Sequence, residues 1–145
     1  MKHLIFIVAY NHEKFIKEVL NRLPDSIRKD NYEILVIDDA SKDKTFKVAN
    51  DWKEKNKKIK IKILKNSKNY GYGGNQKIGM QYAVNNKFDN LILLHGDGQY
   101  APEIIQDFLN YHIIEQASLT LGSRMLIKKN ALKGKMPFYK FIGNI

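Results

Sequence analysis

Residues 91–100 read Leu-Ile-Leu-Leu-His-Gly-Asp-Gly-Gln-Tyr, an apolar run that ends abruptly in polar residues spaced two apart. Such a run predicts a buried strand that leads into a loop, and open α/β sheets bind ligands beyond the carboxyl ends of their strands. Mg²⁺ and Mn²⁺ prefer carboxylate and amide oxygens, and Mn²⁺ also accepts imidazole. Because side chains alternate along an extended chain, we expect His95, Asp97 and Gln99 on one side of the loop, as a candidate Mg²⁺ or Mn²⁺ site. The alternative is a polar turn in which Asp97 caps the helix expected from Pro102.

Strand and helix patterns alternate along the rest of the chain. The expected strands are residues 3–9, 32–38, 59–64, 90–94 and 117–121, and the expected helices are residues 12–23, 43–56, 73–86 and 102–112. Regular alternation predicts an α/β fold, with a mostly parallel sheet, right-handed crossovers and helices on both faces. The loops after the first, second, fourth and fifth strands should then lie along one edge. No linker or repeat divides residues 1–145, so we expect a single domain.

Composition limits the class of protein. The 145 residues are 43% hydrophobic and include no cysteine. A disulfide framework and a zinc–thiolate site are therefore excluded, and the chain is compatible with a cytoplasmic location. The apolar stretch at residues 4–10 is too short for a signal peptide or a membrane span, so a buried strand explains it better.

The net charge of +10 comes largely from lysine, and many of the lysines lie between Lys53 and Lys68. Within that block, Lys60-Ile61-Lys62-Ile63 alternates like a strand with one solvated face. Lysine on an outer strand protects a sheet edge against pairing with other chains, and this explanation is favoured over attraction to anionic lipid, phosphate or nucleic acid. The sequence has no zinc finger, RNA-recognition aromatic motif or basic heptad helix, so we expect no nucleic-acid partner.

Two further polar segments follow the first two expected strands. Residues 9–13 read Ala-Tyr-Asn-His-Glu, and residues 38–45 read Asp-Asp-Ala-Ser-Lys-Asp-Lys-Thr. Helix capping accounts for some of these side chains, but not for two consecutive acids at the end of a strand. One of Asp38 and Asp39 is expected to point into the ligand crevice and to accept a hydrogen bond from a nucleotide base. Uracil and guanine carry the ring N–H that this bond needs, whereas adenine and cytosine lack it, so the pair predicts UDP or GDP.

Taken in order, these segments resemble glycosyltransferase family 2, and within it the polyprenyl-phosphate and dolichyl-phosphate sugar transferases. The resemblance covers essentially the whole chain. Five motifs carry it: Ala9-Tyr10-Asn11 with Glu13; Val36-Ile37-Asp38-Asp39-Ala40-Ser41 with Asp43 and Thr45; Asn69 with Gly71 and Gly73; Asp97-Gly98-Gln99; and Gly122-Ser123-Arg124. The resemblance implies a Rossmann-like sheet of the GT-A type, which binds a nucleotide-diphosphosugar.

The resemblance also implies the roles of individual residues. Those that would bind the nucleotide of a UDP- or GDP-sugar are Ala9, Tyr10, Asn11, Glu13, Asp38, Asp39 and Gly73, with Asp39 reading the base. The metal ligands would be Asp97, Gln99 and His95. Asp97 would thereby also act in catalysis.

The chain departs from the family pattern at two positions. Val8 stands where the family usually has a proline before the Ala-Tyr-Asn triplet, which should change the stiffness of the loop more than its chemistry. His95 replaces the first carboxylate of the family's Asp-x-Asp-x-Gln metal motif. A neutral imidazole can still bind Mn²⁺, but the site loses one negative charge, so we expect weaker metal binding or a place for His95 behind the direct ligands.

The inferred reaction is transfer of a sugar to a polyprenyl phosphate with inversion. A lipid phosphate is already anionic, so it needs cations to position it rather than a general base. Arg124 can grip a phosphate with two parallel hydrogen bonds and is the second candidate catalytic residue. The expected acceptor-phosphate residues are Arg124, Ser123, Lys135 and Lys140.

Residues 125–145 mix lysines with large apolar side chains, which suits a membrane surface or a segment separated from its packing partner. We therefore expect a location in the cytoplasm at the inner face of the membrane. Members of the family continue well past this point, so the chain resembles a truncated catalytic domain, and both activity and inactivity of this chain alone stay open. A homo-oligomer is compatible with these features.

Other classes of protein fit less well. The cluster Gly71-Tyr72-Gly73-Gly74 lacks the third glycine of a dinucleotide fingerprint, because Gln76 stands there. A response-regulator receiver domain would carry its acid pair after the first strand, and a sugar nucleotidyltransferase would carry a glycine-rich basic loop there. A non-catalytic nucleotide-sugar-binding remnant and a family 2 transferase with a sugar acceptor stay open as alternatives.

Overall fold

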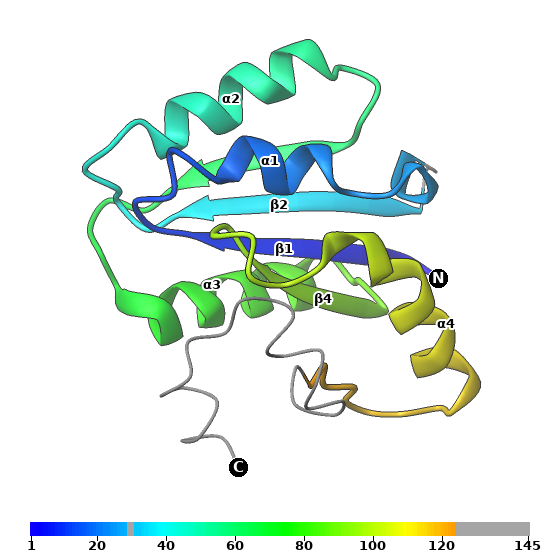
Figure 1. The fold of residues 1–145 in the computed structure, drawn as a ribbon. Coiled ribbons are helices and arrows are strands. Elements are labelled where there is room, and N and C mark those ends of the chain that lie inside the picture. The colour runs from blue at the N-terminus through cyan, green and yellow to red at the C-terminus, as the bar shows by residue number, and fades with distance from the viewer. Residues whose placement is uncertain (29–30, 124–145) are drawn as a thin grey trace, which may run out of the picture. The chain divides into compact units, whose positions relative to one another are not determined.

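Four parallel strands form the sheet, in the order β3-β2-β1-β4 (Figure 1). The computed structural model describes residues 1–28 and 31–123. The strands are β1 (His3–Ala9), β2 (Tyr32–Asp38), β3 (Ile61–Lys65) and β4 (Asn90–His95). Ala9 is paired with Asp38 and Val8 with His95, so the polar segments that follow β1, β2 and β4 begin at the same edge of the sheet. The predicted α/β class and parallel sheet are confirmed.

Helices cover both faces of this sheet, as the alternation of strands and helices predicts. They are α1 (Ile16–Asn21), α2 (Thr45–Lys55), α3 (Gly71–Asn85) and α4 (Ile105–Ile114), with short 3-10 helices η1 (Asp25–Arg28) and η2 (Pro102–Ile104). Figure 1 shows α1 and α2 on one face and α3 on the other.

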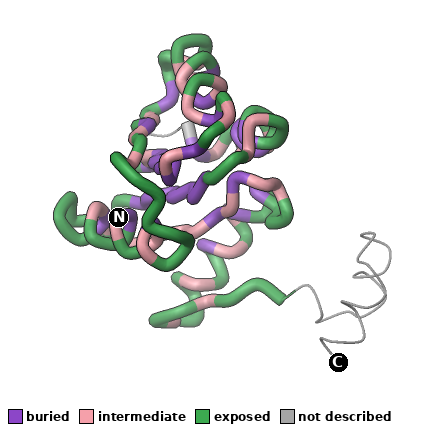
Figure 2. The backbone as a smooth tube through the Cα atoms, turned by 90° about the vertical axis from the view of Figure 1, so that its left-hand side faces the viewer, coloured by how far each residue is buried: buried purple, intermediate pink, exposed green. Residues whose placement is uncertain are grey.

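All seven residues of β1 are buried, because successive side chains enter two different hydrophobic clusters. Ile5 and Ile7 pack in the cluster that includes α1 and α2, whereas Leu4 and Phe6 pack in the cluster that includes Ala83 of α3. Figure 2 shows the buried residues running through the strands, with exposed residues on the outer sides of the helices. The rigid centre of the sheet therefore carries the loops at its carboxyl edge.

The lysine-rich segment forms an outer strand, as its alternation predicts. β3 pairs only with β2 among the described residues. Lys62 is exposed while Ile63 packs in the core, and Lys60 forms a 3.1 Å ion pair with Glu33 on the neighbouring strand. These lysines solvate a sheet edge.

One predicted helix begins later than expected, and one predicted strand is wrong. The helix predicted for residues 12–23 is present as α1 but begins at Ile16, after a turn in which the backbone N–H groups of His12 and Glu13 donate to the side chains of Thr45 and Asp43. Residues 117–121 form no strand; Leu119 and Leu121 are 72% and 79% exposed, and the Thr120 hydroxyl is hydrogen bonded to His112 of α4. An apolar run becomes a strand only where it can pair with a neighbouring strand, and this segment instead folds back on its own helix.

Contacts divide the chain into a first unit, Met1–Leu109, and a second, Asn110–Ile145. The first unit holds the sheet and the loops at its carboxyl edge. No helix within the described residues is long and apolar enough to span a membrane. The organisation as a single domain stays a prediction.

Candidate active site

The loops after β1, β2 and β4 meet at the carboxyl edge of the sheet. Backbone hydrogen bonds continue past the strand ends: Asp39 N donates to Ala9 O at 2.8 Å, and Gly96 N donates to Val8 O at 2.9 Å. Parallel strands bring their carboxyl ends to one edge, and ligand sites of α/β proteins lie there. The sequence-predicted residues in this unit are therefore brought to one region.

Five hydrogen bonds join the loop after β1 to the loop after β2 and the first residue of α2. The bonds are Asn11 N to Ser41 Oγ, His12 N to Thr45 Oγ1, Glu13 N to Asp43 Oδ2, Lys42 N to Asn11 Oδ1 and Lys44 N to Glu13 Oε2, at 2.7–3.0 Å. Asn11 and Ala40, with φ of 55° and 57°, adopt the left-handed conformation that non-glycine residues rarely use. Such strain persists where surrounding contacts hold it, and it is common at functional sites.

Two of the predicted nucleotide-binding side chains take part in these hydrogen bonds between the loops. Asn11 and Glu13 each accept a backbone hydrogen bond from the second loop. Asp43 lies beside Glu13; burial acts to raise the pKa of Asp43, but hydrogen bonds from Thr45 and from the Glu13 backbone hold it below its usual value. Asn11 and Glu13 therefore fix the shape of the edge, whatever they also bind.

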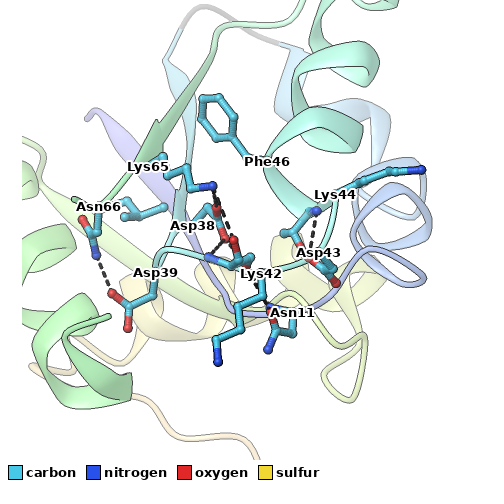
Figure 3. Close-up of polar contacts among 12 residues, drawn as sticks. Asn11, Asp38, Asp39, Lys42, Asp43, Lys44, Phe46, Lys65 and Asn66 are labelled. Carbon is cyan, nitrogen blue, oxygen red and sulfur yellow. Dashed lines mark hydrogen bonds and ion pairs between the residues drawn. The ribbon is translucent and has the colours of Figure 1, made fainter. Parts of the chain in front are cut away.

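The neighbouring carboxylates of Asp38 and Asp39 point in different directions (Figure 3). Asp38 is completely buried and accepts hydrogen bonds from the backbone and hydroxyl of Ser41. Its second oxygen lies 3.7 Å from the Lys65 ammonium. Asp38 therefore ties the loop after β2 to the end of β3.

Asp39 turns toward the start of α3. Its Oδ1 accepts hydrogen bonds from Asn66 Nδ2 at 2.7 Å and from Tyr70 N at 3.0 Å, and Tyr70 N also donates to Oδ2 at 3.1 Å. Asn66 Nδ2 also lies 3.4 Å from Oδ1 of the buried Asn75. A carboxylate offers about four lone-pair positions. Oδ2 therefore keeps an acceptor position for one further donor.

The loop after β4 is a turn, so the extended loop predicted for residues 95–99 is wrong. Gly98 has a φ of 74°, which reverses the chain, and the backbone N–H of Gln99 donates to Asp97 Oδ1 at 3.0 Å. Asp97 thus caps its own turn rather than the helix at Pro102. It is half-buried, and Gln99 is exposed.

His95 lies among aromatic rings. Its Nε2 is 3.1 Å from the Tyr72 hydroxyl, and its ring centroid is 5.1 Å from that of Tyr72 and 4.5 Å from that of Tyr100. Burial raises the pKa of Tyr72, so this hydroxyl stays protonated at neutral pH. These contacts hold the imidazole at the end of β4.

The side chains around Asp97 fit a metal ion that is also bound by the phosphate oxygens of a ligand. Within residues 1–28 and 31–123, no three His, Asp or Glu side chains are grouped closely enough to form a metal cage. Asp97 keeps one carboxylate oxygen outside the turn, and His95 is two residues away. Mg²⁺ usually takes only one or two protein carboxylates and fills its shell with phosphate oxygens and water. The residues present fit that kind of site.

The remaining predicted residues are placed as follows. Ala9 is buried at the end of β1, Tyr10 is half-exposed, and Gly73 lies exposed in the first turn of α3. Ser123 is exposed and belongs to the second unit. Arg124, Lys135 and Lys140 lie outside the described residues.

Sequence reasoning missed three side chains of this edge. Asn66 directly follows β3, so its position after a strand was a usable signal. Arg22 is one of three arginines among 25 basic residues, and only an arginine can bind a carboxylate with the forked geometry seen here. Asn75 is polar yet 2% exposed, and no pattern in its helix predicted that burial.

A parallel α/β sheet with this carboxyl edge is the architecture of GT-A glycosyltransferases. A solved mannosyltransferase from Pyrobaculum calidifontis, in complex with GDP-Man and Mn²⁺, matches with a TM-score of 0.63 and 18% identity over 83% of this chain and 34% of that chain. TarS residues 1–349 from S. aureus, in complex with UDP, match with a TM-score of 0.61 and 19% identity over 88% of this chain and 40% of that chain. Both comparisons show the fold, and the GT-A prediction is confirmed.

Residues 4–141 match the family described as Glycosyl transferase family 2, and the chain belongs to it. An uncharacterized protein of Methanocaldococcus jannaschii is 36% identical over 99% of this chain and 55% of its own length. The UDP-N-acetylglucosamine–dolichyl-phosphate N-acetylglucosaminyltransferase of Methanococcus voltae is 33% identical over 97% of this chain and 58% of its own length. The dolichol-phosphate mannosyltransferase of Pyrococcus furiosus is 28% identical over 97% and 37%. The chain thus spans about half the length of the first two curated relatives.

Proposed function

We propose that this chain is the nucleotide-sugar-binding part of a glycosyltransferase that moves a sugar from a UDP- or GDP-sugar to a polyprenyl phosphate. The observation that carries the proposal is the position of Asp39 and Asp97, which follow β2 and β4 at one edge of a GT-A sheet. Support for the lipid acceptor comes from the names of relatives, which include dolichyl-phosphate sugar transferases of three organisms.

Asp39 would bind the base. The side chain has two protein donors and keeps an acceptor position on Oδ2. The ring N–H of uracil or guanine supplies the matching donor. The joined loops after β1 and β2 would hold Ala9 and Tyr10 against the nucleotide, with Asn11, Glu13 and Asp38 fixing the loops and Gly73 leaving room above α3.

Asp97 would face the diphosphate. In the reaction, an oxygen of the acceptor phosphate forms a bond to the anomeric carbon as the bond from that carbon to the β-phosphate oxygen breaks. This single displacement inverts the anomeric centre. Mg²⁺ or Mn²⁺ at Asp97, with Gln99 and His95 adjacent, would supply Lewis-acid stabilisation of the leaving diphosphate. The position of Asp97 is set by its own turn, so it needs little rearrangement to meet a ligand.

The acceptor side is proposed from the sequence alone. Arg124, with Ser123, Lys135 and Lys140, would bind the phosphate of the lipid, and the lysine-rich segment that follows would lie against the inner face of the membrane. A sugar acceptor is the second candidate, because a relative that is 24% identical is named a poly(ribitol-phosphate) N-acetylglucosaminyltransferase.

A transfer assay tests this function. The chain is incubated with Mn²⁺ and radiolabelled UDP-N-acetylglucosamine or GDP-mannose, with dolichyl phosphate in detergent micelles as the acceptor. We expect label in the organic-extractable lipid, and none with Asp97→Asn. Nucleotide binding without transfer would contradict the transfer reaction and identify a non-catalytic nucleotide-sugar-binding remnant. Label on a water-soluble glycan in a parallel arm would favour the sugar acceptor.

A further inference from the structure

Arg22 joins three segments that are far apart in the sequence. It caps the C-terminus of α1, and its guanidinium forms a forked ion pair with Glu103 of η2, with Nε–Oε1 at 2.6 Å and Nη2–Oε2 at 3.1 Å. The third nitrogen, Nη1, donates to the carbonyl oxygen of Gly98 at 3.3 Å. Arg22 thereby links α1 and η2 to the turn after β4.

The Gly98 carbonyl belongs to the peptide unit that holds Asp97. That unit consists of the carbonyl of Gly98 and the N–H of Gln99, and it is planar, so fixing one end fixes the other. Arg22 binds the carbonyl, and the N–H donates to Asp97 Oδ1 at 3.0 Å. The guanidinium and the Asp97 carboxylate are therefore connected through a single rigid group.

On the side of α1, a cavity leaves part of this peptide unpacked, and the side chains nearest to Gly98 are those of Val19 and Arg22. The cavity has a volume of about 230 Å³, and its lining includes Phe15, Glu18, Arg22, Asp97 and Gly98. Gly98 itself has a φ of 74°, a conformation that must be held by contacts because glycine can readily leave it. The Arg22 guanidinium lines this cavity and donates the hydrogen bond that holds the Gly98 carbonyl.

The ion pair adds little to overall stability. The side chains of Arg22 and Glu103 are 32% and 50% exposed, and exposed ion pairs typically contribute little to folding. Its effect is local: the Arg22 guanidinium lowers the pKa of Glu103, so this carboxylate stays charged and keeps the guanidinium aimed at the turn.

We propose that Arg22 is a positioning residue that aims the Asp97 carboxylate at the metal–diphosphate site through the Gly98–Gln99 peptide. This inference rests on the proposed function, because the proposed function places a metal-bound diphosphate at Asp97. The variant that tests this role is Arg22→Met, which keeps the aliphatic part of the side chain and removes all three donor nitrogens. Lys47→Met is the control, because it breaks an exposed 2.6 Å ion pair with Asp51 on α2, away from this turn.

Calorimetric titration of UDP and GDP, with and without Mn²⁺, tests the proposal. Arg22→Met should weaken the Mn²⁺-dependent part of the affinity by about tenfold, as loss of groups behind a metal ligand typically does. Affinity without metal and the urea unfolding midpoint should change no more than in Lys47→Met. Arg22→Lys should restore the binding only in part, since an ammonium cannot form the fork. An unchanged Mn²⁺-dependent affinity would overturn the proposal, as would equal loss with and without metal.

Hydrogen exchange separates this inference from the proposed function. If the wild-type chain binds neither nucleotide, the proposed function fails, but the Gln99 amide still reports on the peptide. Its exchange should be several-fold faster in Arg22→Met than in the wild type or Lys47→Met. Equal rates in the three proteins would show that Arg22 does not hold this turn.

Discussion

Replacing Asp39 by asparagine removes the charge that we place against the nucleotide base while leaving most of the fold's contacts possible. The asparagine oxygen can take the place of Oδ1 and accept from Asn66 and Tyr70, and only the second, 3.1 Å bond from Tyr70 N to Oδ2 is lost. The amide nitrogen then replaces Oδ2, so the base N–H meets a donor instead of an acceptor. Because the side chain is only 2% exposed, water cannot readily substitute for the lost bond.

A lost charge-assisted hydrogen bond of this kind costs about 1–3 kcal/mol, roughly a 5- to 150-fold weaker affinity. Titration calorimetry with UDP and GDP measures the affinity, and urea unfolding measures the stability. Asp51→Asn, on the exposed side of α2, is the matched control and should leave binding unchanged. If Asp39→Asn binds both nucleotides as tightly as the wild type, Asp39 does not read the base.

Two further predictions concern the frame that carries the site. A Cβ at Gly79 would lie 2.1 Å from a ring carbon of Phe6. Gly79→Ala should therefore lower the free energy of unfolding, measured in urea, by about 1–3 kcal/mol. Gly73→Ala is the control and should not lower it, because a Cβ at Gly73 would meet no atom within 4 Å. Burial, followed by the N-terminal charge, lowers the pKa of His3 below its usual 6.5. Near and below pH 6.5, His3 therefore binds a proton more readily in the unfolded chain than in the native chain. The free energy of unfolding should then fall as the pH drops below about 6.5. Thermal melts at pH 5.5 and 7.5 should show a smaller difference for His3→Gln than for the wild type.

The sheet was predictable because its strands are continuous apolar runs. Strands predicted at 3–9 and 32–38 match β1 and β2 residue for residue. A parallel strand that is covered on both faces is a continuous apolar run, so its ends can be read directly from the sequence. The direction of the strands then brought the correct loops to one edge. The likeness of the ordered motifs to family 2 added the identity of the fold.

What the sequence did not predict depends on contacts between distant residues. The turn before α1 is bonded to Asp43 and Thr45, about 30 positions away, and the turn at Gly98 combines a positive φ with a hydrogen bond from Arg22. Asn66 completes the surroundings of Asp39 from another strand end. The segment at 117–121 was predicted as a strand from its apolar residues, but a strand also needs a partner. Side-chain bonds across loops have no sequence period, so pattern reasoning cannot find them.

The most direct test of the central claim is calorimetric titration of UDP and GDP into the wild-type chain and Asp97→Asn, each with and without Mn²⁺. We expect one nucleotide to bind at a single site, and Mn²⁺ to tighten that binding strongly in the wild type but little in Asp97→Asn. Mn²⁺ alone should bind weakly, because the diphosphate supplies most of the negative charge. No binding of either nucleotide, with or without Mn²⁺, would contradict the account of this edge as a nucleotide-sugar site.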